Sequence, residues 1–598
     1  MAINPNPDGI SSADAWRRAL EMTAPIADHP SVTLPTLIED LADRFGAAPA
    51  LSSEQEGLSY RDLADRVARY ARWALAQRLA GGEVVCLVMA NCPDYMAIWL
   101  GITRVGGIVA LVNTNLVGAS LEDAIKLAAP RHVIVGAGLV GAVAAVLPRL
   151  DPEIRCWVHG TDGFGLPRID HPIAADGRGR LDPADCRAPS IYDRALYLYT
   201  SGTTGLPKAA FVSHFRLMQW SHWFAGMMAA RPTDRMYDCL PMYHSTGGVV
   251  ATGAMLVAGG CVVIRQRFSA SRFWADIVEE GCTLFQYIGE LCRYLVNAPP
   301  DPRETRHRLR LCCGNGMQGD VWSIVQRRFR IPQVLEFYAA TEGSFSLYNC
   351  EGKVGAVGRI PPYLAHRFPV ALVRLDAETG APLRDDKGLC IRCAVDEPGE
   401  AIGKIADDRA SPSGRFEGYT DAEASERKIL RDVFARGDAW YRSGDLMRRD
   451  RSGYFYFVDR IGDTFRWKGE NVSTMEVAEA IAACPGIVDA VVCGVAVPGT
   501  EGRAGLAAIV TGKNFDLAGF RARLAERLPD YAQPVFLRIC GKIEMTATFK
   551  PQKQNLAREG YDPAVIADPL YFNDRSLGAF MRLDAALHRA IRDGKVRL

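Results

Sequence analysis

The sequence lacks an excess of charge of either sign. Its first residues also lack the pattern of a signal peptide. Its 598 residues include 70 Lys and Arg and 69 Asp and Glu, which gives a formal net charge of +1. This balance excludes the basic surplus of a nucleic-acid-binding domain. The first residues, Met1 to Asp8, have neither the basic start nor the apolar core of a signal peptide. We therefore expect a cytoplasmic location, with peripheral contact to the inner face of a membrane left open.

Long apolar runs are also scarce, and one segment approaches the length of a membrane-spanning helix. Gly247 to Ile264 is uncharged and apolar over eighteen residues, but it holds five glycines. It ends in Cys261-Val262-Val263-Ile264, which is typical of a strand. We predict a buried helix, a turn at Gly259-Gly260 and a core strand, and no transmembrane segment.

The cysteines lack the spacing of a zinc site or a disulfide framework. Sixteen cysteines are scattered along the chain, and the single C-x-x-C pair, Cys390 and Cys393, has no second pair and no nearby histidine. Buried, reduced thiols in a cytosolic protein explain this distribution better.

Near the N-terminus, Leu34 to Leu79 is typical of a helix, a hairpin and a second helix. Apolar residues share one side of the second helix; they are Leu63, Val67, Tyr70 and Ala74. Its arginines lie elsewhere; they are Arg61, Arg66, Arg69 and Arg72. They form either an ordinary solvated face or a surface that rests on anionic lipid.

Short apolar runs separated by helix-length segments follow, and this alternation predicts a parallel sheet flanked by helices. The runs are Val84–Met89, Gly107–Val112 and Val133–Val135, and the pattern resumes after residue 230. After about residue 365 the chain changes to short β-like pieces with turns.

A smaller α+β unit follows from Ile461. Its expected elements are a helix from Thr474, strands near Val488–Val495 and Ala507–Val510, and a helix over Leu517–Leu528. We predict a large α/β domain over residues 1–460, with parallel sheets flanked by helices plus a β-barrel-like subdomain. A smaller, mobile α+β domain is expected over residues 461–598.

One turn-forming run is suited to hold the phosphates of a nucleotide. It consists of Thr200, Ser201, Gly202, Thr203, Thr204 and Gly205, followed by Lys208. Small residues let backbone N–H groups approach phosphate oxygens, the hydroxyls add donors, and the lysine adds a charge. The spacing of a Walker P-loop is absent, because Pro207 precedes the lysine and Ala209 follows it. The alternative is a Gly/Thr-rich surface loop without a ligand.

The same run closely resembles the phosphate-loop signature of the adenylate-forming superfamily, which includes acyl-CoA synthetases, luciferases and the adenylation domains of peptide synthetases. A second element, Tyr338-Ala339-Ala340-Thr341-Glu342, resembles the superfamily's Y-G-x-T-E motif. Its residue types suit ATP: an aromatic ring for adenine, a hydroxyl for the α-phosphate, and the Glu342 carboxylate for Mg²⁺. Ala339 stands where the family usually has glycine.

A third segment spells G-x-G-x-x-G across Gly314 to Gly319, with Glu336 seventeen residues further on. This pattern is close to a dinucleotide-binding fingerprint, so NAD binding is an alternative. The resemblance to the superfamily instead implies that Gly314, Asn315 and Gly316 lie along the adenine.

The resemblance continues downstream. Tyr441-Arg442-Ser443-Gly444-Asp445 matches the family's Y-R-T-G-D motif, which implies that Asp445 binds the ribose hydroxyls. Arg460 matches the arginine before the interdomain hinge, and Gly462 supplies torsional freedom there. Lys550 corresponds to the catalytic lysine of the C-terminal domain, and Gly469 to a residue that lines the pantetheine tunnel of CoA.

Further strings resemble the branch of fatty acid transport proteins and very-long-chain acyl-CoA synthetases. They are Asn91–Tyr95, Ala97–Gly101, Leu111–Leu116, Tyr287–Tyr294, Phe465–Val472, Glu501–Gly505 and Asp568–Phe572. The branch implies an acid–thiol ligase that uses ATP, Mg²⁺ and CoA. A fatty carboxylate is first joined to AMP, and the CoA thiol then displaces AMP.

The segment around His244 bears on the substrate class. Leu240 to Gly247 offers no Asp to pair with the amine of an amino acid, so an apolar carboxylic acid is favoured, with His244 as a residue of the acyl pocket or a structural histidine. Ligases for bile acids or other non-fatty carboxylates remain open. So do an acyl-AMP ligase that serves a carrier protein and a fatty-acid uptake protein.

Overall fold

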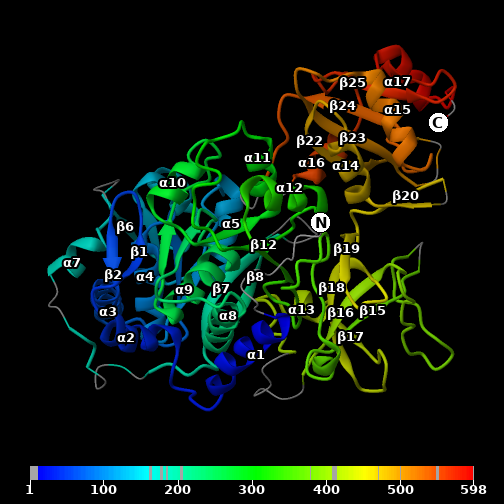
Figure 1. The fold of residues 1–598 in the computed structure, drawn as a ribbon. Coiled ribbons are helices and arrows are strands. Elements are labelled where there is room, and N and C mark those ends of the chain that lie inside the picture. The colour runs from blue at the N-terminus through cyan, green and yellow to red at the C-terminus, as the bar shows by residue number, and fades with distance from the viewer. Residues whose placement is uncertain are drawn as a thin grey trace. The chain divides into compact units, whose positions relative to one another are not determined.

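The computed structural model describes residues 11–160, 165–175, 179–182, 186, 188–201, 207–376, 379–406, 414–468, 470–498, 500, 502–546, 551–596 and 598. The chain divides into two compact units, which are described separately (Figure 1). Unit 1 comprises Met1–Val370, Gly403–Arg431 and Asp438–Tyr441, and unit 2 comprises Ala371–Ile402, Asp432–Gly437 and Arg442–Leu598.

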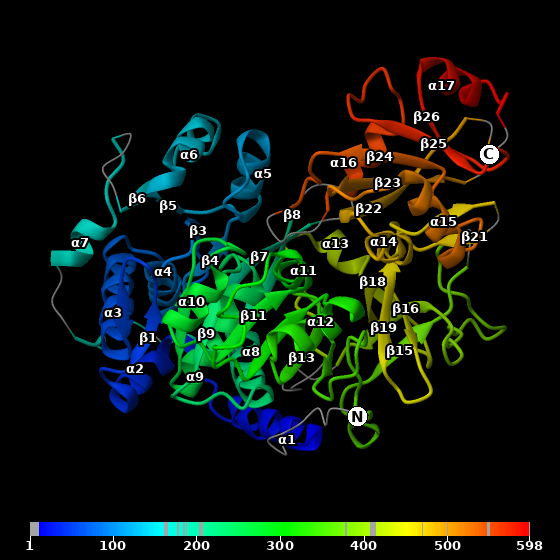
Figure 2. The same ribbon diagram turned by 45° about the horizontal axis from the view of Figure 1, so that its top comes forward.

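The first sheet of unit 1 has six strands. They are β3 (Val84–Val88), β4 (Ile108–Leu111), β5 (His132–Gly136), β6 (Arg155–His159), β7 (Arg194–Ser201) and β8 (Pro207–Ser213). Their order is β6-β5-β3-β4-β7-β8, and only β8 runs antiparallel to its neighbour. The parallel arrangement predicted from the apolar runs is therefore confirmed in β3, β4 and β5. Figure 2 shows α5 and α6 near this sheet, and both pack on its strands.

The second sheet of unit 1 has eight strands. They are β1 (Pro49–Ser52), β2 (Gly57–Ser59), β9 (Arg235–Asp238), β10 (Cys261–Ile264), β11 (Leu284–Ile288), β12 (Leu311–Asn315), β13 (Gln333–Ala339) and β14 (Ser346–Asn349). Their order is β14-β13-β12-β11-β9-β10-β1-β2. The six inner strands are parallel, and β14 and β2 are antiparallel at the two edges.

The helices of unit 1 connect and cover these sheets. They are α1 (Ser12–Thr23), α2 (Leu34–Phe45), α3 (Tyr60–Ala76), α4 (Pro93–Arg104), α5 (Gly118–Ala128), α6 (Val140–Val146), α7 (Asp170–Ala175), α8 (His214–Met227), α9 (Thr252–Ala258), α10 (Phe273–Glu279), α11 (Gly289–Asn297), α12 (Gly319–Phe329) and α13 (Ala422–Glu426). The short strand β17 (Ile429–Arg431) pairs with Ala439–Tyr441 at the start of β18.

Helix α3 buries the apolar side that its sequence predicted. Ser59 caps the helix by accepting from the backbone of Asp62, and the four predicted apolar residues are at most 3% exposed. On the arginine side, Arg61 is exposed, whereas Arg66 is partly buried and paired. Arg66 bonds Glu56 at 2.9 Å and Asp94 at 2.8 Å, because the helix packs closely against α4.

The long apolar segment folds as expected. It forms a π-helical stretch (Thr246–Ala251), α9 and strand β10, with Gly259 in the left-handed region at φ +80° between helix and strand. Within the described residues, the structure has no helix that is both long and apolar enough to cross a membrane. All sixteen cysteines are free thiols, as their spacing predicted.

Unit 2 begins with a small sheet. It contains β15 (Val370–Val373) and β16 (Gly399–Lys404) in large part, the second half of β18 (Ala439–Arg449) and all of β19 (Phe455–Arg460). Strand β16 lies between β15 and β18, and β19 pairs with β18.

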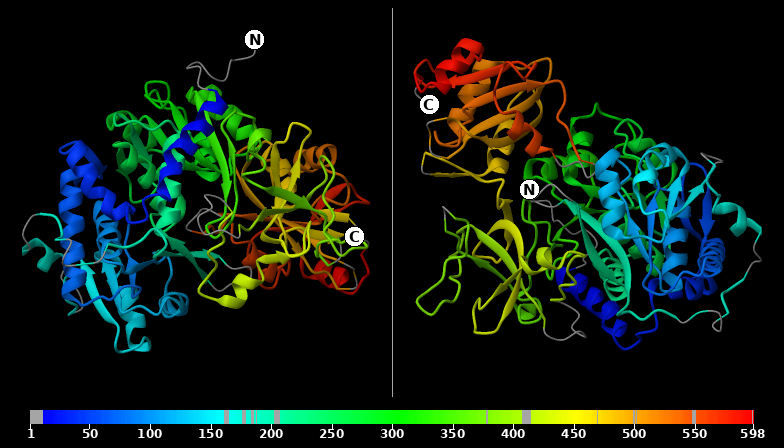
Figure 3. Two further views of the ribbon diagram at one scale, coloured as in Figure 1. Left: turned by 90° about the horizontal axis from the view of Figure 1, so that it is seen from below. Right: turned by 180° about the vertical axis from the view of Figure 1, so that it is seen from behind.

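The rest of unit 2 is an α+β arrangement, drawn in orange and red in Figure 3. Its elements are β20 (Phe465–Trp467), β21 (Glu470–Val472), β22 (Ile487–Val495), β23 (Ala504–Thr511), β24 (Phe536–Cys540), β25 (Leu570–Asp574), β26 (Ala579–Arg582), α14 (Thr474–Ala482), α15 (Leu517–Arg527), α16 (Lys553–Glu559) and α17 (Ala585–Arg592). Strands β22 to β26 form one sheet in sequence order. The predicted helices and strands after Thr474 are thus present, and a shared core buries Ile481, Leu506 and Phe536.

Candidate functional site

The predicted site residues of unit 1 gather where parallel strands of the second sheet end. The carboxyl ends of β9, β11, β12 and β13 share one edge, because these strands run parallel as neighbours. The residues at or just after these ends are His244, Gly314, Asn315, Gly316, Tyr338, Thr341 and Glu342. Ligands of open α/β sheets bind beyond such ends. The motifs that the sequence singled out therefore meet at the expected edge.

The phosphate-loop candidate connects β7 and β8. Thr200 lies opposite Lys208, and Ser201 lies opposite Pro207, so the run forms a hairpin. The loop itself, Gly202, Thr203, Thr204 and Gly205, lies outside the described residues. The strands on either side of the run are paired, and the phosphate contacts stay a prediction.

The segment of residues 417–419, which the sequence did not indicate, lies beside strand β8. Tyr419 pairs with Ala210 of β8 in an antiparallel bridge. Phe211 N donates to Gly418 O at 3.0 Å, and the Ser213 hydroxyl donates to Glu417 Oε1 at 2.6 Å. The only local signal was the turn-prone Gly418, which gives no indication of a partner some 200 residues away.

Arg216, near the start of α8, ties this segment to the Thr341 loop. Its guanidinium is 6% exposed and donates to Thr341 O at 2.6 Å and to Arg415 O at 2.7 Å. A planar fork with several donors suits this bridging of two backbone carbonyls. The arginine therefore holds two loops of the site at fixed positions.

Glu342 lies in the centre of this arrangement and is 7% exposed. Its Oε1 accepts hydrogen bonds from the hydroxyl of Tyr419 at 2.6 Å and that of Tyr441 at 3.2 Å. The described part of the chain holds no group of three His, Cys, Asp or Glu suited to a metal. Mg²⁺ commonly takes one or two carboxylates and completes its shell with phosphate and water, so a single Glu342 fits the ion.

The neighbouring motif residues support a nucleotide site. The hydroxyls of Thr341 and Ser245 lie 3.4 Å apart, so the loop after β9 meets the loop after β13. Tyr338 is half-buried, with its ring 5.7 Å from that of Phe345. Ala339 ends β13 in an ordinary strand conformation, because it is not among the residues with positive φ. The alanine in place of the family's glycine therefore causes no strain there.

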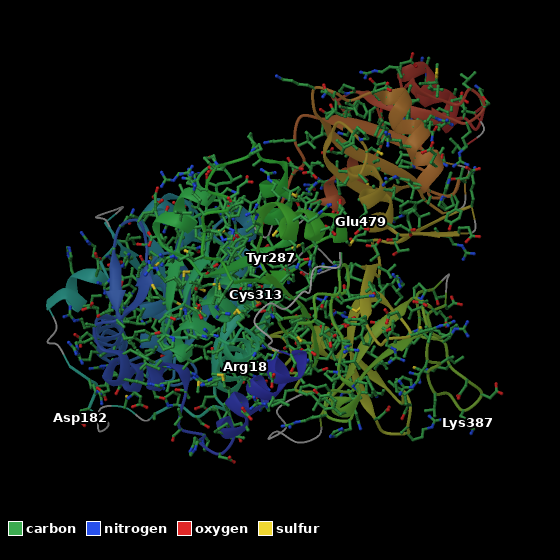
Figure 4. The ribbon with its side chains drawn as sticks, in the orientation of Figure 1. Arg18, Asp182, Tyr287, Cys313, Lys387 and Glu479 are labelled. Carbon is green, nitrogen blue, oxygen red and sulfur yellow. The ribbon has the colours of Figure 1, made fainter. Side chains whose placement is uncertain are left out.

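Gly314 lies in β12, and Gly316 begins the loop after it, which is held by hydrogen bonds from inside the fold. Gly316 N donates to Glu336 Oε1 at 2.5 Å, and Met317 N donates to the same oxygen at 3.3 Å. The hydroxyl of Tyr287, labelled in Figure 4, donates to the other carboxylate oxygen. Burial raises the pKa of Glu336 to about 8. The carboxylate is turned into the fold. The acid of a dinucleotide-binding fingerprint would instead face the bound ligand.

His244 is held by residues from the strings that indicated the branch. Asn91 donates to Leu240 O at 2.7 Å and accepts from Met242 N at 2.9 Å. Asn115 donates to the hydroxyl of Tyr243 at 3.2 Å. These contacts fix the loop that carries His244, whose ring packs against that of Tyr243.

The site candidates of unit 2 are described on their own. Asp445 lies opposite Arg460 in the β18–β19 register, and their charged groups are 3.6 Å apart. Asp445 is 9% exposed. Lys550 and Gly469 lie outside the described residues, although β20 and β21 on either side of Gly469 form a hairpin.

Comparisons with known proteins agree with these motifs. The sequence profile of the AMP-binding enzyme family matches residues 38–393, and that of the AMP-binding enzyme C-terminal domain matches residues 476–550. Long-chain fatty acid transport protein 1 of Rattus norvegicus is 39% identical over 579 residues, or 95% of this chain and 88% of the relative.

Two solved structures share the fold. A benzoate CoA ligase from Burkholderia xenovorans LB400 has a TM-score of 0.74 at 20% identity, over 88% of this chain and 100% of that one. ATP-bound MatB from Rhodopseudomonas palustris has a TM-score of 0.72 at 23% identity, over 88% and 99%. The expected fold class is confirmed: a large α/β part with parallel sheets and a curled half-barrel sheet, and a small α+β part. The chain belongs to the AMP-binding, adenylate-forming enzyme family and is related to the long-chain fatty acid transport proteins.

Proposed function

We propose that the protein joins a long-chain or very-long-chain fatty acid to CoA at the expense of ATP, releasing AMP and pyrophosphate. The observation that carries the proposal is the contact of Thr341, which precedes Glu342, with Ser245, which follows His244, at the carboxyl edge of the second sheet. The 39% identity with a long-chain fatty acid transport protein over 95% of the chain supports the fatty acid as substrate.

The reaction has two steps. A carboxylate oxygen of the acid attacks the α-phosphorus of ATP, which forms acyl-AMP and releases pyrophosphate. The sulfur of CoA then attacks the acyl carbonyl, AMP leaves, and the thiol proton passes to solvent. Activation is required because a carboxylate is a poor electrophile, whereas AMP is a good leaving group.

Residue roles in this reaction remain proposals. The loop from Thr200 to Gly205 and Lys208 would bind the phosphates, and Tyr338 with Gly314, Asn315 and Gly316 would bind the adenine. Asp445 would bind the ribose next to Arg460, and Lys550 would neutralise charge at the α-phosphate during adenylation. Gly469 would leave room for the pantetheine arm of CoA, and His244 would line the acyl pocket.

Glu342 would hold Mg²⁺ together with the phosphates of ATP. When bound, the ion neutralises phosphate charge and supports the departure of pyrophosphate. The chain's part is to present one oriented carboxylate oxygen at the edge of the sheet.

The surroundings of the acyl pocket favour an apolar acid. The carboxylate nearest in sequence to His244 is Asp238, which is fully buried and accepts from Leu240 N at 3.1 Å. Burial raises the pKa of Asp238 well above its usual range. Because this carboxyl is fully buried, it is poorly placed to pair with a substrate ammonium, which disfavours amino acids.

The test is ATP–pyrophosphate exchange with a panel of C8 to C24 fatty acids, a bile acid and amino acids, followed by addition of CoA to each acid that responds. Exchange with long acids and a CoA-dependent product are expected. Exchange without CoA transfer would instead indicate delivery to a carrier protein. Exchange with none of the acids would contradict the proposal.

Uptake of fatty acids is a second candidate, because the relatives are named transport proteins. In that case a Lys550→Ala variant that makes no acyl-CoA would still import fatty acid into cells. A cytoplasmic location with peripheral membrane contact belongs to the same proposal and is tested by fractionation of cells that express the chain.

A further inference from the structure

Tyr419 connects three parts of the candidate site. Its backbone bridges Ala210 of β8, its hydroxyl donates to Glu342 at 2.6 Å, and its ring lies 5.7 Å from the ammonium of Lys208. The side chain is 4% exposed, so these contacts are shielded from solvent. One residue thus contacts the predicted phosphate-binding lysine and the predicted metal-binding carboxylate.

Tyr441 completes the support of Glu342 from a different segment. Its hydroxyl reaches the same oxygen, Oε1, at 3.2 Å, and its own side chain is 0% exposed. Two donors on Oε1 fix the rotation of the carboxylate. They also leave Oε2 as the oxygen available to a cation, since the hydrogen bonds of Glu342 in the described part of the chain all go to Oε1.

We propose that Tyr419 and Tyr441 are positioning residues that orient Glu342 for a magnesium–nucleotide complex, with Tyr419 also supporting Lys208 through its ring. The inference rests on the proposed function, because it assigns a role within the same nucleotide site. It predicts that loss of the hydroxyl weakens the contribution of Mg²⁺ to nucleotide binding and leaves the metal-free contribution unchanged.

The experiment uses the full-length chain and the non-cleavable analogue α,β-methylene-ATP. Calorimetric titration gives its Kd with saturating Mg²⁺ and, separately, with EDTA. Tyr419→Phe keeps the ring over Lys208 and removes only the hydroxyl, and Tyr441→Phe removes the second donor. Tyr363, which is 60% exposed in the short helix Pro362–Leu364, gives the matched control Tyr363→Phe.

The ratio of the two Kd values is the readout. In the wild type and in Tyr363→Phe, Mg²⁺ should tighten binding by the same factor. In Tyr419→Phe that factor should fall by about tenfold, the value of one charge-assisted hydrogen bond of about 1.4 kcal/mol, and in Tyr441→Phe by less because its bond is longer. The Kd in EDTA should stay unchanged in all four proteins.

The remaining outcomes separate the inference from the proposed function. An equal weakening of binding with Mg²⁺ and with EDTA would show a merely structural tyrosine and would overturn the inference. The inference would also be overturned if Mg²⁺ tightened binding to a folded Tyr419→Phe as much as to the wild type. If Tyr419→Phe does not fold, the same result in Tyr441→Phe would overturn it. A wild type that binds no analogue under either condition would instead overturn the proposed function.

Discussion

At the scale of single residues, Glu336 and Glu342 are two buried carboxylates with different surroundings. Glu342 accepts from two hydroxyls on one oxygen and belongs to the sheet edge. Glu336 is 2% exposed and accepts from Tyr287, Gly316 and Met317 inside the fold. The first is suited to a ligand and the second to holding a loop.

Glu336 gives a prediction about stability and pH. Burial raises its pKa to about 8, above the ordinary value of 4.5, so the folded state binds the proton more tightly than the unfolded state. Its contribution to stability is therefore complete below about pH 4.5 and is lost as the pH rises through about 8. Relative to Glu336→Gln, the wild type should lose up to about 1.4 kcal/mol of unfolding free energy per pH unit in this window.

Chemical denaturation at several pH values measures this difference. The surface change Glu21→Gln, at a side chain that is 58% exposed, is the control and should show no such slope relative to the wild type. Parallel stability curves for wild type and Glu336→Gln would contradict the prediction.

The two residues assigned to separate half-reactions give a second prediction at this scale. Lys550→Ala should lose acyl-AMP formation by about 100- to 1,000-fold, because a preorganised charge at the α-phosphate is removed. It should still convert supplied acyl-AMP to acyl-CoA. Gly469→Leu should do the reverse, since the added side chain would fill the thiol path.

Each variant is the control for the other, and both half-reactions are measured in both. Pyrophosphate exchange reports the first step, and acyl-CoA formed from supplied acyl-AMP reports the second. Equal loss of both steps in each variant would refute this division of roles.

At the scale of elements, three neighbouring strands explain why position 314 is a glycine. Tyr287 of β11 pairs with Gly314 of β12, which in turn pairs with Glu336 of β13. A Cβ at position 314 would lie 2.1 Å from the Tyr287 carbonyl oxygen and 2.6 Å from its ring. The missing side chain lets the tyrosine hydroxyl cross the middle strand to reach the carboxylate.

Gly314→Ala should therefore destabilise the protein by about 1–3 kcal/mol, as overpacking of a close contact does. It should also raise the KM for ATP, because the loop that Glu336 holds would shift. Gly141→Ala in helix α6 has nothing within 4 Å of the new Cβ and is the control. Denaturation and exchange kinetics on both variants test this, and a Gly314→Ala protein as stable and as active as Gly141→Ala would be the contrary result.

At the scale of the whole molecule, the residues around Arg460 mark the proposed boundary between the two domains. Asp459 accepts from Thr474 N at 2.6 Å, and Asp463 pairs with Lys553 at 2.9 Å. Gly462 between them has φ +100° and open space around its missing side chain. Because the flanking residues are fastened, we predict that the glycine is the point of torsional freedom for a domain rotation.

Gly462→Ala tests this hinge against Gly453→Ala, a matched change in the turn before β19. Both positions are left-handed, at φ +100° and +85°, so each alanine should cost about 1–2 kcal/mol of stability. Gly462→Ala alone should slow thioester formation relative to adenylation. The rates of adenylation and thioester formation are measured separately. An unchanged ratio of these two rates in Gly462→Ala would contradict the hinge.

Much of the fold followed from local patterns. Apolar runs predicted β3, β4 and β5, helical spacing predicted the buried side of α3, and the glycine pair predicted the turn before β10. These features depend on periodicity and turn chemistry within a few residues, which a sequence displays directly. The nucleotide motifs, in contrast, rested largely on their resemblance to the adenylate-forming superfamily.

Other features could not be found locally. The arginine side of α3 was expected to be solvated or lipid-facing, yet Arg66 is paired with Glu56 and Asp94. The spacing of Glu336 left a dinucleotide-binding site as an alternative, because spacing shows distance along the chain but not the side to which a carboxylate turns.

The sequence by itself determined the family, the strand–helix alternation and the residue types of the site, because each is expressed in short runs of neighbouring residues. Only the tertiary structure decided that Tyr419 and Tyr441, 77 and 99 residues beyond Glu342, share one of its oxygens. The physical reason is that strand order and register, set by packing across the whole unit, choose which distant side chains meet.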